Sequence, residues 1–184
     1  MEALQMVAET ALEVDWCIRE ALEDDAEKLL DYLKQIAEEP LNNTRVRPGS
    51  VPDTPEAQRG VIRWFRERPN STMLVVEAAD KLIGLMQCIG GTSRFTEHNT
   101  ELSINVHSDY RGRGIGKALM DCALEWAQAN PMVRRVELEV LERNERARHF
   151  YERLGFVTEG WRCKSHYLPD EGTYHDPLMM AKCL

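Results

Sequence analysis

The sequence of 184 residues lacks the features of a membrane-spanning, secreted or nucleic-acid-binding protein. No apolar run approaches the roughly 18 residues of a membrane-spanning helix. The N-terminus is acidic and has neither the basic start nor the long apolar core of a signal peptide. Basic residues are in the minority, and the net charge of −8 argues against a general nucleic-acid binder. We therefore expect a cytoplasmic protein with no membrane or nucleic-acid partner.

Cysteine is present but follows no recognisable pattern. The five cysteines are an odd number and include no CxxC pair, so neither a disulfide framework nor a zinc site is indicated. No metal is expected. With 43% hydrophobic residues and no internal repeat or linker, the chain suits one domain, which we place at residues 13–184 after an N-terminal extension of residues 1–12.

Hydrophobic spacing predicts an α/β protein with the element order β-α-α-β-β-β-α-β-α-β-β. Between the first two helices, residues 40–55 are dense in proline, asparagine and glycine and are expected to form a long loop, the kind of segment that often lines a site. The expected helices are 22–39, 55–68, 115–129 and 144–155, and the expected strands are 14–21, a hairpin over 72–91 turning at Asp80 and Lys81, 100–107, 134–140, 156–161 and 174–184.

The stretch "SDYRGRGIGKALM", residues 108–120, places three glycines, two arginines and a lysine just before an apolar helix. Glycine has no Cβ, so the backbone N–H groups of such a loop can approach a ligand closely. The first turn of the following helix adds its own unpaired N–H groups and the positive end of its dipole. An anion is the expected ligand.

Two common phosphate-binding motifs do not fit this loop. The P-loop pattern requires glycine where Arg111 stands and a hydroxyl where Ala118 stands. The dinucleotide pattern GxGxxG can start at Gly112, but its sixth position is Lys117, and the loop follows several strands that look antiparallel. The pattern that remains is Arg-x-x-Gly-x-Gly over residues 111–116.

Together with "NERARHFYERLGF" at residues 144–156, this pattern resembles the GCN5-related N-acetyltransferase (GNAT) family. The resemblance covers roughly residues 13–184 and is closest over 100–156. It implies an α/β acyltransferase fold with a mixed, mostly antiparallel central sheet flanked by helices. It also implies that acetyl-CoA is the co-substrate. The residues that the resemblance assigns to acetyl-CoA are Ile104, Asn105, Val106, Arg111, Gly112, Arg113, Gly114, Ile115, Gly116, Lys117, Asn144, Ala147, Phe150 and Tyr151.

Acetyl transfer needs a proton for the departing thiolate and a neutral amine. The resemblance places Tyr151 near the sulfur, where it is expected to act as the general acid. A lysine-type amine has a reference pKa near 10.4 and must lose a proton before it attacks. Glu101, at the start of the central strand, is the carboxylate that we expect to act as the base, through a water molecule. Arg111 and Arg113 are expected to neutralise phosphate charge.

The acceptor is expected to be a primary amine of a small molecule: an amino acid, a polyamine or an amine antibiotic. A protein N-terminus or lysine is the alternative, and whether the chain forms a homodimer stays open. A non-catalytic acyl-CoA sensor on the same scaffold is a reading of another class, which the presence of Tyr151 disfavours. The acceptor side is expected at the first two helices, the loop 40–55 and four tail residues: Trp161, His166, Tyr167 and Tyr174.

Overall fold

The computed structural model describes residues 6–7, 15–39, 46, 49, 51–168 and 171–184, so most of the loop predicted over 40–55 lies outside the described residues. The strands are β1 (Met6–Val7), β2 (Trp16–Glu20), β3 (Thr72–Ala78), β4 (Lys81–Gly90), β5 (Asn99–Val106), β6 (Arg135–Leu141), β7 (Val157–Trp161), β8 (His166–Leu168), β9 (Thr173–His175) and β10 (Pro177–Cys183). The helices are α1 (Ala26–Glu38), α2 (Pro55–Glu67), α3 (Ile115–Ala129) and α4 (Glu145–Arg153), with single 3-10 turns at η1 (Glu23–Asp25) and η2 (Ser108–Tyr110).

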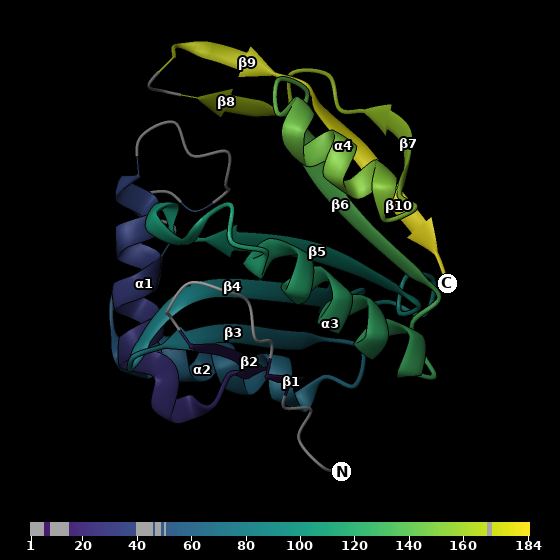
Figure 1. Ribbon diagram of the computed structural model, residues 1–184. Coiled ribbons are helices and arrows are strands. Elements are labelled where there is room, and N and C mark those ends of the chain that lie inside the picture. The colour runs from purple at the N-terminus through teal and green to yellow at the C-terminus, as the bar shows by residue number, and fades with distance from the viewer. Residues whose placement is uncertain (1–5, 8–14, 40–45, 47–48, 50, 169–170) are drawn as a thin grey trace.

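Eight strands form one sheet in the order β1-β2-β3-β4-β5-β6-β10-β7, and β8 and β9 form a separate hairpin. Every neighbouring pair in the large sheet is antiparallel except β5 and β6, which are parallel. The prediction of a mixed, mostly antiparallel sheet flanked by helices is confirmed (Figure 1). None of the described helices is long and apolar enough to cross a membrane.

The predicted order of elements is confirmed from β2 to β10, with two additions. The hairpin of β8 and β9 was not predicted, because strands of three residues carry too little alternation to be recognised. Met6 and Val7, within the predicted N-terminal extension, pair with β2. The turn between β3 and β4 lies one residue earlier than predicted, because Ala79 and Asp80 both have positive φ, as tight hairpin turns require.

Local side-chain signals fix two of the helix starts that matter for the site. Thr54 accepts a hydrogen bond from the Ala57 N–H at 3.2 Å and Pro55 follows it, so α2 begins with a side-chain cap and a proline in its first turn. Asn144 caps α4 in the same way, accepting from the Ala147 N–H at 3.2 Å. Such caps satisfy N–H groups that a helix leaves unpaired at its start.

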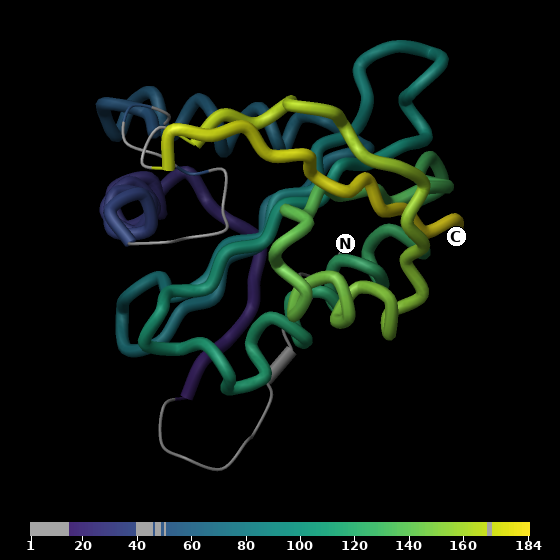
Figure 2. Tube along the Cα trace, turned by 90° about the horizontal axis from the view of Figure 1, so that it is seen from above, coloured from purple at the N-terminus to yellow at the C-terminus, as the bar shows by residue number. Residues whose placement is uncertain are grey.

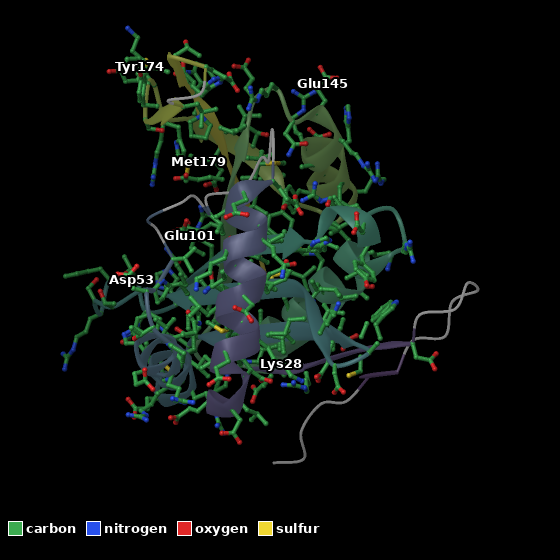
Figure 3. All side chains as sticks on the ribbon, turned by 90° about the vertical axis from the view of Figure 1, so that its left-hand side faces the viewer. Lys28, Asp53, Glu101, Glu145, Tyr174 and Met179 are labelled. Atoms are coloured by element: carbon green, nitrogen blue, oxygen red, sulfur yellow. The ribbon has the colours of Figure 1, made fainter. Side chains whose placement is uncertain are left out.

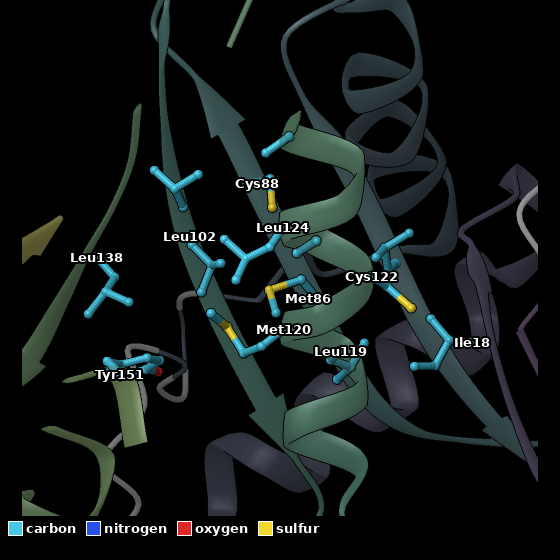
Figure 4. Packing of buried hydrophobic residues seen from close by; sticks show 14 of the residues in the cluster. Ile18, Met86, Cys88, Leu102, Leu119, Met120, Cys122, Leu124, Leu138 and Tyr151 are labelled. Atoms are coloured by element: carbon cyan, nitrogen blue, oxygen red, sulfur yellow. The ribbon is translucent and has the colours of Figure 1, made fainter. Parts of the chain in front are cut away.

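The sheet carries a hydrophobic core on each face. On one face α3 places Leu119 and Met120, both 0% exposed, against the central strands (Figure 4). On the other face α1 and α2 bury Ile36 and Ile62 against Leu85 of β4 and its neighbours. Seen from above, α1 and α2 lie on one side of the sheet, with α3 and α4 on the other (Figure 2). A side chain on a central strand therefore points to one of two faces of the sheet, each with its own hydrophobic core.

The parallel pair β5 and β6 is joined along only part of its length. Register pairs link Asn99, Thr100 and Glu101 of β5 to residues 135–137 of β6, and they end there. Beyond that point β5 continues to pair with β4, and β6 continues to pair with β10. Because each strand follows its other neighbour, the sheet opens between the C-terminal ends of β5 and β6, as Figure 1 shows.

Candidate active site

A cavity of about 590 Å³ lies where β5 and β6 diverge, a volume typical of small-molecule sites. Its walls come from β5, the glycine loop, the first turn of α3, β6 and α4. Of the residues predicted to contact acetyl-CoA, those in its lining are Ile104, Asn105, Val106, Arg111, Gly112, Gly114, Ile115, Gly116, Lys117, Asn144, Ala147, Phe150 and Tyr151. Arg113 and Glu101 are predicted site residues that lie outside the lining.

The glycine loop presents unpaired N–H groups to this cavity. Gly114 is the N-cap of α3 with φ +83°, and the first helical hydrogen bond runs from the Ala118 N–H to its carbonyl at 3.0 Å. The N–H groups of residues 115–117 therefore precede the helical hydrogen-bond ladder. No carboxylate lies in the first turn, and the space beside Gly112 and Gly114 is open. This arrangement suits an anion.

The Arg111 side chain ties three segments together. It forms an ion pair with Glu39, just after α1, and its Nε donates to the Val106 carbonyl at 2.8 Å. The guanidinium thus holds the loop against both α1 and the free end of β5, and its predicted role in neutralising phosphate stays a prediction. Arg113 instead lies near the ring of Tyr110, with its Cζ 5.5 Å from the ring centre.

Further positive charge comes from residues that the sequence analysis did not select. Arg146 and Arg153 of α4 line the cavity together with Arg111 and Lys117. Although the whole chain is acidic, four cationic side chains gather at this cavity. The sequence contained a signal for this pair. Arg146 and Arg153 are seven residues apart, and residues at that spacing lie on the same face of a helix.

The backbone of β5 offers different groups on its two edges. The His107 N–H donates to the Ile83 carbonyl of the β4 side at 2.9 Å. Backbone groups alternate along a strand, so those of Asn105 also face β4, while those of Ile104 and Val106 face the gap towards β6. The backbone groups that face the gap thus belong to Ile104 and Val106, and Asn105 is also among the residues that line the cavity.

Tyr151 lies in the last turn of α4 with 8% of its surface exposed, between the cavity and the core under α3. Its ring centre is 5.4 Å from that of Phe150 and 5.8 Å from that of Phe156. Figure 4 shows it beside Leu138 at the edge of the core cluster. Burial raises the pKa of Tyr151 to about 12, so the hydroxyl keeps its proton at neutral pH.

Two carboxylates on the strands that diverge, Glu101 of β5 and Glu139 of β6, differ in their positions relative to the cavity. Glu101 is half-buried on β5, opposite Glu137 of β6, and lies on the side of the sheet that carries α1 (Figure 3). Glu139, which the sequence analysis did not select, lines the cavity with a side chain only 4% exposed. Its carboxylate forms an ion pair with Arg162 and lies 3.6 Å from Nε2 of His166.

Of the four tail residues expected near the acceptor, the structure places one beside the cavity and three away from its wall. His166 of β8 approaches the cavity through Glu139. Tyr167 and Tyr174 pair across the hairpin of β8 and β9, with ring centres 5.1 Å apart. These two rings and Trp161 are between 52% and 69% exposed and are not part of the cavity wall.

Comparison with known proteins decides the family. The model of the acetyltransferase (GNAT) family matches residues 33–156, which contain the cavity. The chain belongs to the GNAT family. The resemblance predicted from residues 111–116 and 144–156 is confirmed.

Individual relatives agree with this membership. The chain is 36% identical to an uncharacterised N-acetyltransferase of Methanocaldococcus jannaschii, over 56% of its own length and 48% of the relative's length. It is 31% identical to the spermidine N(1)-acetyltransferase of Vibrio cholerae over 58% of this chain and 60% of the relative. These matches span about half to three-fifths of the curated relatives' length. A solved GNAT acetyltransferase of Streptococcus pneumoniae superposes with a TM-score of 0.87 and 28% identity, covering 92% of this chain and 100% of that one.

Proposed function

We propose that this GNAT protein transfers the acetyl group of acetyl-CoA directly to a primary amine of a small molecule, without a metal or a covalent enzyme intermediate. The observation that carries the proposal is the cavity between β5 and β6, which has the unpaired N–H groups of the α3 start at one part of its wall and a buried, protonated tyrosine at another. Membership of the acetyltransferase family supports it.

The cavity suits the chemistry of coenzyme A. The N–H groups of residues 115–117 would hold the pyrophosphate, and Lys117 lies beside them. Arg146 and Arg153 would meet the remaining phosphate charge from the α4 side. The backbone groups of Ile104 and the N–H of Val106, whose carbonyl already accepts from Arg111, would pair with the amides of the pantetheine arm, much as a neighbouring strand does.

Acetyl-CoA supplies a thioester, and groups of the chain would polarise its carbonyl and transfer the protons. An N–H of the free edge of β5 would polarise the thioester carbonyl. Tyr151 would donate a proton to the leaving sulfur. Since burial raises the pKa of Tyr151 to about 12 and a thiol has a reference value near 8.5, this donation must accompany the breaking of the C–S bond. Glu101, through a water molecule, is the proposed acceptor of the amine's proton.

Two observations favour a small cationic acceptor. The chain carries a net charge of −8, which raises the local concentration of cations. Its relative from Vibrio cholerae is a spermidine acetyltransferase. A protein N-terminus or lysine is the second candidate acceptor, and a cytoplasmic location and a possible homodimer stay part of the proposal.

The test is a panel of amines incubated with acetyl-CoA and the protein, with detection of free thiol. The panel contains spermidine, amino acids, an aminoglycoside and peptides with free N-termini. We expect thiol release that depends on an amine and is competed by CoA but not by ATP. Tight CoA binding without thiol release from any amine would contradict the proposal and favour the acyl-CoA sensor.

A further inference from the structure

The C-terminal end of β5 is held from one side by α1. Tyr32 of α1 is 2% exposed, and its hydroxyl donates a hydrogen bond to the Asn105 carbonyl at 3.0 Å. Glu39 follows the last residue of α1, and its Oε1 accepts from the Ser108 N–H at 2.9 Å. In Figure 1 this end of α1 lies beside the turn that follows β5. Residues seven apart lie on the same side of a helix, so one side of α1 contacts both ends of the segment 105–108.

The Glu39 carboxylate joins two parts of the glycine loop. While Oε1 accepts from Ser108, the other oxygen, Oε2, forms the ion pair with Arg111. Arg111 in turn donates through its Nε to the Val106 carbonyl at 2.8 Å. The Glu39 side chain is only 9% exposed, so salt screens this ion pair less than it screens a surface pair. One carboxylate thus holds the loop where it leaves β5 and again at the first residue of the motif.

This bridge lies between the two parts of the site that a long ligand has to reach. The open edge of β5 ends at Val106, because its carbonyl already accepts from Arg111. The unpaired N–H groups at the start of α3, those of residues 115–117, come next along the chain. Residues 107–114 connect the two parts, and the carboxylate holds this segment at two points. It therefore fixes the spacing between the strand edge and the anion site.

We propose that Glu39 is a positioning residue for acetyl-CoA. It is not among the residues that line the cavity, so it acts through Ser108 and Arg111. A ligand that spans two elements binds more tightly when their spacing is fixed in advance, because binding then orders fewer groups. The proposal also changes the role of Arg111. Its charge is matched by Glu39, and the phosphate charge is left to the other cationic side chains of the cavity.

This inference rests on the proposed function and is tested by calorimetry with CoA and the full chain. Glu39→Gln keeps an oxygen that can accept from Ser108 but has no charge for Arg111, whereas Glu39→Ala removes both contacts. The matched control is Glu38→Gln, because Glu38 is the exposed last residue of α1 and carries the same charge one position earlier. Thermal unfolding without CoA shows that each variant is folded.

We expect Glu39→Gln to raise the Kd for CoA roughly 3- to 10-fold and Glu39→Ala roughly 10- to 50-fold, because hydrogen bonds to a charged group are lost. The KM for acetyl-CoA should rise with the Kd, while kcat and the KM for the amine stay within about twofold, since Glu39 touches no reacting group. A residue that only stabilises the fold would lower Tm and leave the Kd of the folded protein unchanged. Glu38→Gln should behave as the wild type.

A double-mutant cycle shows whether Glu39 acts through Arg111. The variants are Arg111→Gln, Glu39→Gln and their combination. The combined substitutions should raise the Kd for CoA by less than the product of the two single effects, because either change alone breaks the same ion pair. A combined effect equal to that product would refute the action through Arg111.

Equal CoA constants for the wild type and both Glu39 variants would overturn the positioning role while leaving acetyl transfer intact. Tighter CoA binding by Glu39→Gln would also overturn it, because the carboxylate would then compete with phosphate for Arg111. A comparable loss in Glu38→Gln would do the same, since the effect would follow the charge at the end of α1. If Glu39→Ala does not fold, Glu39→Gln decides. Failure of the wild type to bind CoA would instead refute the proposed function and this inference with it.

Discussion

Replacing Gly114 tests the anion site most directly. Gly114 has φ +83° and begins α3, and among the described residues no heavy atom outside the adjoining chain lies within 4 Å of the position that a Cβ would occupy. In the free protein a side chain there costs only backbone strain, roughly 1–2 kcal/mol. For a chain of this length that lowers Tm by about 2–4 °C per kcal/mol. Any larger effect must come from the ligand.

The effect of charge is isolated by comparing Gly114→Glu with Gly114→Gln, which have the same length and strain. A carboxylate about 4 Å from a phosphate charge costs about 1 kcal/mol in water and about 4 kcal/mol at a protein surface with reduced screening. The cavity is partly open to solvent, so we take an intermediate cost of about 2 kcal/mol for placing the carboxylate beside the phosphate. Gly114→Glu should therefore bind CoA about 30-fold more weakly than Gly114→Gln.

Calorimetry with CoA measures this difference, and thermal unfolding without CoA measures the strain. Gly172→Ala is the control for strain, since Gly172 also has positive φ and open space but lies at the β8–β9 turn. It should lower Tm and leave CoA affinity unchanged. If folded Gly114→Glu binds CoA as tightly as Gly114→Gln, no anion lies at the start of α3 and the assignment of the cavity fails.

Three further substitutions test other parts of the site. Tyr151→Phe should lower kcat by about 10²–10⁴-fold with little change in CoA affinity. Because burial raises the pKa of Tyr151 to about 12, the hydroxyl stays protonated below that pH, and the loss should be uniform from about pH 6 to 9. An unchanged rate, with chemistry rate-limiting, would assign the ring to packing alone. Glu101→Gln should slow acetyl transfer most near neutral pH, and less as the pH approaches the pKa of the amine. A loss of rate that is constant with pH would exclude Glu101 as the base. Arg111→Lys should weaken CoA binding about 2- to 10-fold, because one ammonium cannot replace the guanidinium at both Glu39 and the Val106 carbonyl. If the variant binds CoA with wild-type affinity, Arg111 does not position the loop for CoA.

Local features of the fold and site were predictable from the sequence. The motif over residues 111–116 lies between a strand and a helix, and the structure has that strand, loop and helix in place. Asn144 was assigned from its motif, and its side chain caps α4 at the cavity wall. These features depend on neighbouring residues, so short-range patterns contain them.

Features that depend on tertiary contacts were not predictable in the same way. Alternation puts Glu139 on the polar face of its strand, which usually indicates a solvated carboxylate. Its burial depends on Arg162 and His166, which the β7–β8 segment brings to it from more than twenty residues along the chain. The length over which β5 and β6 pair likewise depends on β4 and β10, and no local pattern records it.

The position of the single parallel pair explains why the anion site and the opening in the sheet coincide. Parallel neighbours need a crossover connection, and α3 is the crossover from β5 to β6. The chain leaves β5 at its C-terminal end, so α3 must begin there and direct its unpaired N–H groups to that edge. The paired residues 99–101 and 135–137 lie at the N-terminal ends of both strands, which leaves the gap at the same edge. Pairing at the opposite ends would have placed the gap at the negative end of α3, where an anion is repelled.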